Sequence, residues 1–387
     1  MRRLLVLVCA IVLVDTMLYA ALVPLLPGYA AEYGLSKTGA GLLVAAYAAG
    51  VLVGGLPGGV AAARYGPRAA AIAGLVVIAI SSVGFAFAAD AWTLGAARVL
   101  QGFGSALSWA GGLAWLVAIA PRERRGEMLG TALAGAIVGA LLGPVIGGIA
   151  SVAGARPAFV GVGILTALLA GWALRTAGAP AEAVRLAAVG AAFREGRFVG
   201  GLWLMVLPSL LLGILAVLVP LDLAAFGWGA LAIGAVYLVG AALEAGANPF
   251  IGRVCDRRGV GLPIRAALGV SLLVSVALAW ANTAAVVAAL AIAAGTAYGA
   301  LLTPALALLS DGAERVGLSQ GVAFGLMNAA WAAGNTVGPA GAGAMGDLVG
   351  DPAAYGAAAA ACAVTLLTVA PRRRLAVTRP RRVPTEP

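Results

Sequence analysis

The sequence predicts an all-α membrane protein with twelve transmembrane helices in two pseudo-symmetric six-helix bundles. Two observations predict this fold class. The 387-residue chain is 62% hydrophobic and only 10% charged, whereas a soluble domain of this length needs far more charged surface. In addition, sequence features of the first half recur at nearly half the chain length, which indicates a duplicated unit with a binding site between the two copies.

Twelve apolar stretches are long enough to cross a bilayer as helices. Asp15 interrupts the first stretch, which therefore reads as a retained helix and not as a cleaved signal peptide. One long polar connection divides the chain, and we interpret it as a solvated cytosolic linker. The predicted domains are a first bundle, the linker, a second bundle and a basic cytosolic tail, at residues 1–174, 175–197, 198–371 and 372–387. The predicted spans are residues 4–26, 38–62, 69–89, 91–119, 128–152, 158–174, 198–221, 229–252, 262–281, 284–309, 320–345 and 353–370.

The basic residues are distributed unequally between the two sides of these spans. Nearly all arginines fall on the side of the N-terminus, while the other side holds Lys37 and Arg156. Because short cytosolic loops carry the excess of basic residues, both termini are predicted to be cytosolic, in a bacterial plasma membrane. The net charge of +10 is therefore a topology signal, and we predict no nucleic-acid partner.

The residue inventory excludes several kinds of chemistry. The chain has no histidine, which removes histidine-based catalysis, a histidine proton relay and most zinc sites. The sequence also lacks a metal-ligand cluster and a nucleotide-binding loop, so we predict no enzyme, no metal and no cofactor. One chain contains both bundles, and we expect it to work as a monomer in the lipid bilayer.

An uncharged stretch at residues 130–148 carries glycine at every fourth position along one helix face. A neighbouring helix can approach such a face closely, and the proline within it favours a kink. On spacing alone the stretch is typical of a GxxxG packing face. Its defining residues are Gly139, Gly143, Pro144, Gly147 and Gly148.

Two loop sequences, 193 residues apart, form another internal repeat. Both are short, glycine-bounded and rich in arginine, as expected of tight cytosolic turns that fix topology. The first copy has Ala63 where the second has an acid. The residues of the repeat are Gly59, Arg64, Gly66 and Arg68 in the first copy, and Gly252, Asp256, Arg257 and Gly259 in the second.

These motifs resemble those of the major facilitator superfamily and occur in its order along nearly the whole chain. The loops are similar to its GxxxDRxG signature, and Arg98-x-x-Gln101-Gly102 resembles its fourth-helix signature. The glycine stretch resembles the fifth-helix signature of its twelve-helix drug/proton antiporters. The resemblance implies that the loop acid and base latch the bundles on the cytosolic side, with Ala63 weakening one latch. The alternative is a basic turn that only fixes topology.

Three ionisable residues lie within predicted spans: Asp15, Arg98 and Glu244. A charge at the centre of a membrane helix costs about 2.5–3.5 kcal/mol on insertion scales, so such residues are functional candidates, although a buried pair can also hold helices together. The surroundings of Asp15 resemble the first span of drug exporters and vesicular monoamine transporters, where an acid engages protons or cationic substrates. Burial should favour its protonated form.

The other two charges are given roles relative to Asp15. The resemblance links Arg98 to proton coupling, either as a partner that approaches and leaves Asp15 or as a fixed ion pair. Glu244 is predicted to be a second proton-coupling carboxylate, contributed by the opposite bundle. Its alternative is a protonated carboxyl that hydrogen-bonds Asn248, one turn away.

Aromatic and amide residues within the spans are candidates to line an amphiphile pocket. Tyr19 lies one turn from Asp15 and can stack on a ligand or donate to it. Isolated membrane tryptophans more often pack or anchor at interfaces, so the strip from Asn328 to Asn335 is the stronger signal. With Asp15, the substrate-binding candidates are Tyr19, Trp203, Tyr237, Asn248, Tyr298, Asn328, Trp331 and Asn335.

The resemblance, together with the acid within the first span, implies a secondary transporter that exports amphiphilic small molecules in exchange for protons, by alternating access. Its partners would be the small-molecule substrate, protons and the lipid bilayer, with the proton gradient as the energy source. An exporter of a specific metabolite, such as a sugar or an amino acid, and an uptake symporter are the alternatives within the same fold. A receptor or scaffold that no longer transports is a more remote one.

Overall fold

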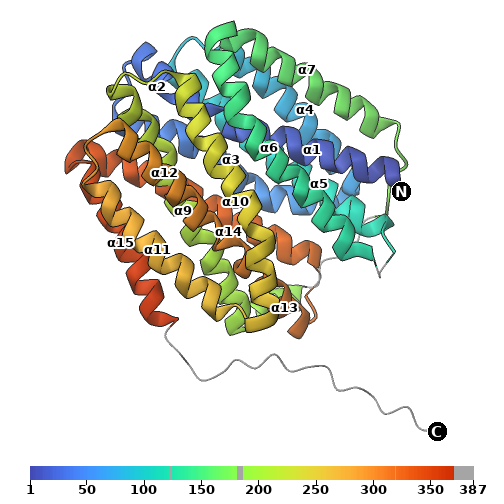
Figure 1. The fold of residues 1–387 in the computed structure, drawn as a ribbon. Helices are drawn as coiled ribbons and strands as arrows, with labels where there is room; N and C mark the ends of the chain where they lie inside the picture. Colours follow the sequence, from blue (N-terminus) through green and yellow to red (C-terminus); the bar gives the residue numbers. More distant parts are fainter. Residues whose placement is uncertain (122–123, 181–185, 319, 370–387) are drawn as a thin grey trace.

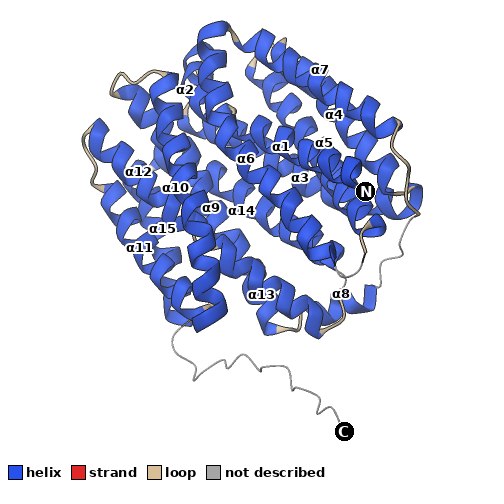
Figure 2. Ribbon diagram, turned by 45° about the vertical axis from the view of Figure 1, so that its right-hand side comes forward, coloured by secondary structure: helices blue, strands red, loops and turns tan. Residues whose placement is uncertain are grey.

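The computed structural model describes residues 1–121, 124–180, 186–318 and 320–369, and these residues form helices joined by short connections, without a strand (Figures 1 and 2). Long uninterrupted apolar sequences favour helices because a helix satisfies its own backbone hydrogen bonds in a membrane. The helices are α1 (Arg2–Ala20), α2 (Leu22–Glu32), α3 (Lys37–Tyr65), α4 (Pro67–Ala86), α5 (Ala91–Ile119), α6 (Arg125–Ala153), α7 (Ala155–Leu174), α8 (Leu186–Ala192), α9 (Gly196–Ala225), α10 (Ala230–Arg258), α11 (Gly261–Ala279), α12 (Ala284–Gly299), α13 (Leu302–Arg315), α14 (Gln320–Leu348) and α15 (Asp351–Thr368).

Within the described part of the chain, ten helical stretches are long and apolar enough to cross a membrane. Two of these stretches consist of two consecutive helices, α1 with α2 and α12 with α13, which join at a local break in the backbone. Helices α14 and α15 occupy the positions of the eleventh and twelfth predicted spans. The order of the predicted helices is thus confirmed, and ten of the twelve predicted spans meet the length and apolarity that crossing a membrane requires, although most helices extend several residues beyond the predicted bounds.

The helices pack as two groups with matching internal contacts (Figure 1). In the N-terminal group, α1–α7, helix α1 packs on α6 and α3 packs on α5. In the C-terminal group, α9–α15, helix α9 packs on α14, as α1 packs on α6 in the first group. The two groups meet where α3 packs on α14 and where α6 packs on α10. The contact of α1 with α6 corresponds to that of α9 with α14, and the contact of α3 with α14 corresponds to that of α10 with α6. The arrangement therefore repeats by a pseudo-two-fold relation.

The connection between the two groups contains the short helix α8. Residues 181–185 of the predicted linker and residues 370–387, which include the predicted tail, lie outside the described residues. The domain boundaries therefore stay predictions.

Successive spans run in alternate directions, so the helix ends define two faces. We call the face where α1 begins and α3 ends the terminal face, and the face where α2 ends and α3 begins the opposite face.

The glycine stretch of α6 packs against the backbone of α1. A Cβ atom at Gly139 would lie 2.3 Å from the carbonyl oxygen of Leu13, and one at Gly147 would lie 2.2 Å from that of Ala21. The corresponding glycines of α14 contact α9 in the same way. The stretch is therefore a packing face within the N-terminal group, and it fixes the helix that carries Asp15. Gly148 turns away from this face and lies beside Leu231 of α10.

Candidate functional site

Asp15 lies in the middle of α1 and is almost completely buried, with 4% of its surface exposed. Its carboxylate accepts three hydrogen bonds: from the hydroxyl of Tyr47 at 2.9 Å, from that of Ser105 at 2.8 Å and from Nε1 of Trp109 at 2.7 Å. These donors come from α3 and α5, so three helices converge on one carboxylate. Neutral donors reduce the cost of burying a carboxylate without cancelling its charge. The site therefore keeps the capacity to take up a proton or a cation.

Arg98 lies beside this carboxylate but does not pair with it. Among the described residues, no ion pair joins Arg98 and Asp15; the guanidinium bonds Oε1 of Gln101 at 3.0 Å and lies 4.8 Å from the centre of the Tyr47 ring. Its other bonds go to the carbonyl oxygens of Leu18 and Tyr19, both at 3.4 Å. Tyr47 thus links the arginine and the carboxylate, and the fixed ion pair considered from the sequence is not present.

An aromatic cluster continues from Asp15 to the boundary between the two helix groups. The ring of Tyr19 lies 5.1 Å from that of Tyr47 and 5.2 Å from that of Trp331. The hydroxyl of Tyr19 donates to Oδ1 of Asn335 at 2.7 Å, which connects α1 to α14. Asn335 is 2% exposed, whereas Tyr19 and Trp331 are half-buried. The structure therefore brings together four predicted residues: Asp15, Tyr19, Trp331 and Asn335.

The sequence analysis missed Tyr47, Ser105 and Trp109. Each is neutral, so none carries the cost in hydrocarbon that identified Asp15. A signal was nevertheless present in the fourth span, because Arg98, Gln101, Ser105 and Trp109 recur at the three- to four-residue spacing of one helix face. Tyr47 had no comparable signal, since α3 contains few polar residues around it.

Glu244 forms a separate polar site in α10. Its carboxyl group lies directly against Gly299 at the break between α12 and α13, where a Cβ on the glycine would be 2.1 Å from Cδ of the glutamate. Asn248, one turn further along α10, accepts a hydrogen bond from Thr303 Oγ1 at 3.0 Å. Both roles considered for Glu244, a proton-coupling carboxylate and a protonated carboxyl bonded to Asn248, stay predictions.

We expect Glu244→Gln to shift the pH dependence of transport, or its preference among cations, while leaving the fold intact. The reason is that glutamine has the same shape but cannot exchange a proton. Initial rates measured over a series of external pH values would check this expectation. Asn248→Asp, which keeps a side chain of the same size, is the matched comparison. Rates that follow the wild-type profile for Glu244→Gln would leave Glu244 with a packing role against Gly299.

Other predicted substrate residues have not been found in contact with Asp15 or its donors in the described part of the chain. Trp203 is 47% exposed and donates to Thr365 at 3.1 Å, and Tyr298 is 1% exposed with its hydroxyl 2.7 Å from that of Ser275. Tyr237 donates to the carbonyl oxygen of Leu215 at 2.7 Å. Their observed contacts are with their own C-terminal group and stabilise its helix packing. Asn328 lies half-buried on α14, one turn before Trp331.

The loop repeat occupies corresponding turns at the terminal face. Gly66 and Gly259 both adopt positive φ, 90° and 78°, a conformation that glycine adopts without strain. Arg68 donates to the carbonyl oxygens of Ala173 and Leu174, which end α7, so this arginine satisfies the last turn of a neighbouring helix. A Cβ atom at Gly59 would meet no atom within 4 Å, and one at Gly252 would lie 4.0 Å from the methyl group of Thr303.

The charged residues of these loops are not joined across the groups in the described part of the chain. Arg64 lies over the ring of its neighbour Tyr65, with 5.6 Å between the guanidinium carbon and the ring centre. Asp256 and Arg257 are exposed, and no hydrogen bond or ion pair of either is found among the described residues. The role of these residues as a latch therefore stays a prediction.

Residues 8–324 match the family model of the Major Facilitator Superfamily. The chain belongs to this superfamily. It is also 39% identical over 123 residues to the "Probable vesicular acetylcholine transporter-B" of Danio rerio, a match that covers 30% of this chain and 25% of that protein. The chain thus spans about a quarter of this curated relative.

Two solved structures share the fold across almost the whole chain. One is a bacterial homolog of the human lysosomal transporter Spinster, in an inward-facing and unoccupied conformation, with a TM-score of 0.73 and 16% identity over 95% of this chain and 93% of that one. The other is a D-xylose-proton symporter, with a TM-score of 0.73 and 16% identity over 95% and 96%. These likenesses confirm the predicted fold, and the superfamily consists of transporters and not of enzymes.

In this superfamily member the two groups are tied together at the opposite face. Asp347 of α14 accepts hydrogen bonds from the backbone N–H of Lys37 and of Thr38, at 3.1 and 2.8 Å, and from the Thr38 hydroxyl at 2.6 Å. These contacts, those with the Thr38 side chain above all, lower the pKa of Asp347 to about 2. Lys37 Nζ pairs with Asp351 of α15. We call Lys37, Thr38, Asp347 and Asp351 the opposite-face gate.

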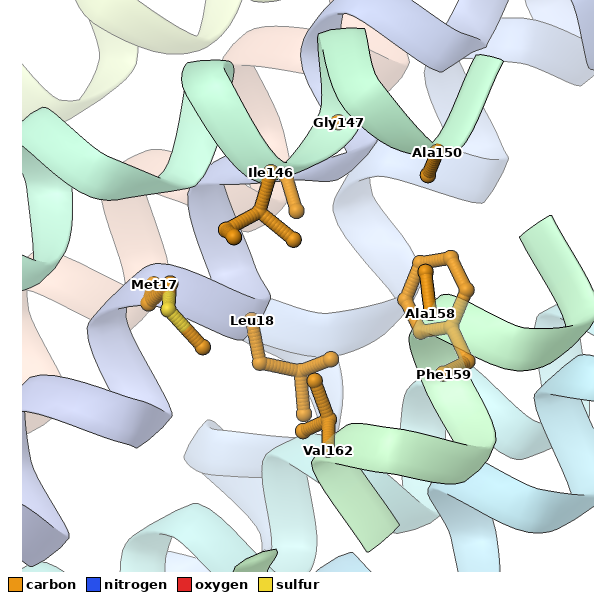
Figure 3. Close-up of a pocket in the computed structure, with 9 residues that line it drawn as sticks. Met17, Leu18, Ile146, Gly147, Ala150, Ala158, Phe159 and Val162 are labelled. Atoms are coloured by element: carbon orange, nitrogen blue, oxygen red, sulfur yellow. The ribbon is translucent and has the colours of Figure 1, made fainter. Parts of the chain in front are cut away.

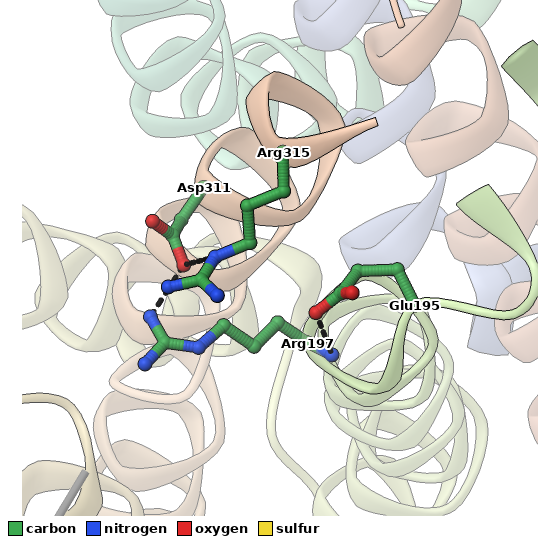
Figure 4. Close-up of polar contacts among 4 residues, drawn as sticks. All are labelled: Glu195, Arg197, Asp311 and Arg315. Atoms are coloured by element: carbon green, nitrogen blue, oxygen red, sulfur yellow. Dashed lines mark hydrogen bonds and ion pairs between the residues drawn. The ribbon is translucent and has the colours of Figure 1, made fainter. Parts of the chain in front are cut away.

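Two further features of the superfamily member do not form a substrate site. An apolar cavity of about 10 Å³ lies between α1, α6 and α7, with Met17, Leu18 and Phe159 in its wall (Figure 3). It offers no polar partner to a ligand and can hold at most one water-sized molecule. At the terminal face, Asp311 forms ion pairs with Arg197 and with Arg315, and its Oδ2 lies 3.1 Å from Nε of Arg315 (Figure 4). The pair with Arg197 ties the start of α9 to α13. This network lies within the C-terminal group.

Proposed function

We propose that this transporter exports amphiphilic small molecules, with cations preferred, in exchange for protons across a bacterial plasma membrane. The observation that carries the proposal is the Asp15 site. One buried carboxylate there has three neutral donors and no ion-pair partner among the described residues. A proton and an organic cation would compete for this carboxylate. Such competition produces exchange, because binding of one favours release of the other.

The surroundings of Asp15 suit an organic cation. The ring of Tyr19 lies 5.1 Å from that of Tyr47 and 5.2 Å from that of Trp331, and the indole N–H of Trp109 donates to the carboxylate itself. Aromatic faces attract cations by about 0.5–2 kcal/mol each, more when water is excluded. The relative from Danio rerio is described as an acetylcholine transporter, and this agrees with a cationic substrate.

The proposal includes sidedness and energy source. Both termini would be cytosolic because the arginines gather at the terminal face, and the opposite face would then be external. Movement between a conformation closed at the opposite face and one closed at the terminal face would carry substrate past Asp15. The proton gradient would be the only energy source, with no cofactor, and the monomer would suffice.

The test is proton release from energised everted membrane vesicles that contain the protein. Lipophilic cations, neutral drugs, sugars and amino acids are added one at a time, and vesicles without the protein are the control. We expect the lipophilic cations to collapse the proton gradient and the sugars and amino acids to leave it unchanged. Collapse by a sugar or an amino acid alone would indicate a dedicated metabolite exporter. A gradient that no member of the panel changes would contradict proton-coupled export.

A further inference from the structure

The two helix groups touch along a line between α3 and α14, which starts at the opposite-face gate and runs inward. At its outer end the two backbones are in contact, because a Cβ atom at Gly343 would lie 2.2 Å from the carbonyl oxygen of Lys37. About four turns further along α3, Val51 shares a buried apolar cluster with Ala332 of α14. The half of α3 that begins at the opposite face is therefore packed against the other group.

At the inner end of this line, Tyr19 of α1 bridges the two groups. Its ring lies 5.1 Å from that of Tyr47, in its own group, and 5.2 Å from that of Trp331, in the C-terminal group. Its hydroxyl donates to Oδ1 of Asn335 at 2.7 Å. We call Tyr19, Trp331 and Asn335 the inner contact. It joins α1 to α14 by one hydrogen bond and one pair of rings.

The amide of Asn335 is almost completely shielded from water, with 2% of the residue exposed. Its Oδ1 accepts the bond from Tyr19, and its Nδ2 lies 3.5 Å from the carbonyl oxygen of Trp331, one turn earlier on α14. A buried polar group is destabilising when it is unpaired. The bond from Tyr19 therefore holds the two groups together, and both of its polar ends have to be solvated when the groups separate.

The inner contact lies on the side of Asp15 that faces the opposite face. Helix α1 begins at the terminal face, and Tyr19 lies one turn further along this helix than Asp15. Tyr47 contacts both residues, since its hydroxyl donates to the Asp15 carboxylate at 2.9 Å and its ring packs on Tyr19. The inner contact is thus the layer of structure next to the carboxylate on the way to the opposite face.

We propose that the hydrogen bond from Tyr19 to Asn335 is an inner gate that controls access to Asp15 from the opposite face, with Asn335 as a positioning residue. While the bond is formed, the ring of Tyr19 is held against Trp331 and covers the path to the carboxylate. Opening separates α1 from α14, and water solvates the hydroxyl and the amide. The inference rests on the proposed function in one respect, that the exchanged proton passes this gate. It gives Asn335 a task other than contacting the substrate.

The test measures how fast a cysteine behind the gate reacts with a membrane-impermeant thiol reagent. Cys9, Cys255 and Cys362 are first replaced by alanine. Val51→Cys then places a thiol in the buried cluster, and it adds no volume because cysteine is smaller than valine. An anionic methanethiosulfonate is the reagent, because the carboxylate of Asp15 repels it. Neither a substrate nor a proton gradient is supplied.

The reagent is added from one side of the membrane at a time, to intact cells and to everted vesicles. Trp92 is 89% exposed at the start of α5, on the opposite face. Labelling of a Trp92→Cys protein therefore shows in which preparation the reagent meets the opposite face. The measurement does not depend on the predicted orientation of the chain.

Tyr19→Phe and Asn335→Leu are each expected to raise the labelling rate from the opposite face by about fivefold or more. Each leaves one buried polar group unpaired in the closed state, which shifts the population toward the open state. The double variant leaves neither group unpaired, so its rate should fall below that of either single variant. The rate from the terminal face should not rise in any of the three, whereas a general loosening of the fold would raise it.

Tyr33→Phe is the matched control. It removes a tyrosine hydroxyl near the opposite face whose 3.2 Å bond, to the carbonyl oxygen of Ala88, stays within the N-terminal group. Its labelling rate should equal that of the parent protein. Ala332→Cys, at a position that is 0% exposed on α14, repeats the measurement from the other group if the Val51→Cys protein folds poorly.

Three results would overturn the inner gate. The first is a parent rate in both single variants. The second is a double variant whose rate is the product of the two single effects, because the two side chains would then act independently. The third is faster labelling from both faces. Export assays fail or succeed separately: a gate that opens as expected in a protein that exchanges no cation for protons would contradict the proposed function alone.

Discussion

Asp15→Asn is expected to abolish proton-coupled transport and to leave the fold intact. Asparagine keeps the size of the side chain and one oxygen for the donors of α3 and α5, but it cannot take up or release a proton. Its amide nitrogen would meet one of the present donors, and an unsatisfied buried donor costs about 1–3 kcal/mol. The measurement is substrate-dependent proton release in everted vesicles, where we expect the signal to fall to that of vesicles without the protein.

Two comparison variants make the Asp15 result interpretable. Asp90→Asn changes an exposed acid that caps α5 through Thr93, and asparagine is an equally good capping residue, so transport should remain at the wild-type level. Ser105→Ala removes one donor to Asp15 without changing the charge, and a smaller loss of coupling is expected. A well-folded Asp15→Asn protein that still exchanges substrate for protons would refute the assignment of Asp15 as the coupling residue.

Much of this site could be predicted from the sequence, and its limits have physical causes. Asp15 was identified because a charge in hydrocarbon is costly, and the glycine stretch because its period matches a helix face. The family resemblance suggested Arg98 as a partner of Asp15, but sequence spacing cannot show that Tyr47 would contact both of them. The contact depends on how α3 packs against α5, which involves residues far apart in the chain.

The opposite-face gate shows a different limit of sequence reasoning. Lys37 entered the sequence analysis only as a basic residue on the less basic side, and Asp347 and Asp351 were given no role in it. Their meeting results from the packing of α3 on α14, which brings the first turn of one helix to the last turn of another. Trp203 and Tyr298 were chosen by residue type alone; in the structure their hydrogen bonds lie within the C-terminal group, and their role in substrate binding stays a prediction.

Gly102→Ala is expected to destabilise the protein strongly and to disrupt the Asp15 site. A Cβ at this position would lie 1.8 Å from the carbonyl oxygen of Tyr47 and 2.9 Å from the backbone nitrogen of Val51. These are backbone atoms of α3, so relief requires the whole helix to move away from α5. Overpacking of a helix interface costs about 1–3 kcal/mol, and backbone contact places this case at the upper end or above.

The same displacement would lengthen the 2.9 Å bond between Tyr47 and Asp15, so thermal stability and proton coupling should fall together. Thermal unfolding of the purified protein in detergent, measured beside vesicle transport, would check this. Gly95→Ala is the matched control, because it lies on the same helix and its Cβ would meet no atom within 4 Å. Alanine there should gain up to about 1 kcal/mol of helix propensity. If Gly102→Ala were as stable and active as Gly95→Ala, the close approach of α3 and α5 would not be what holds Tyr47 on the carboxylate.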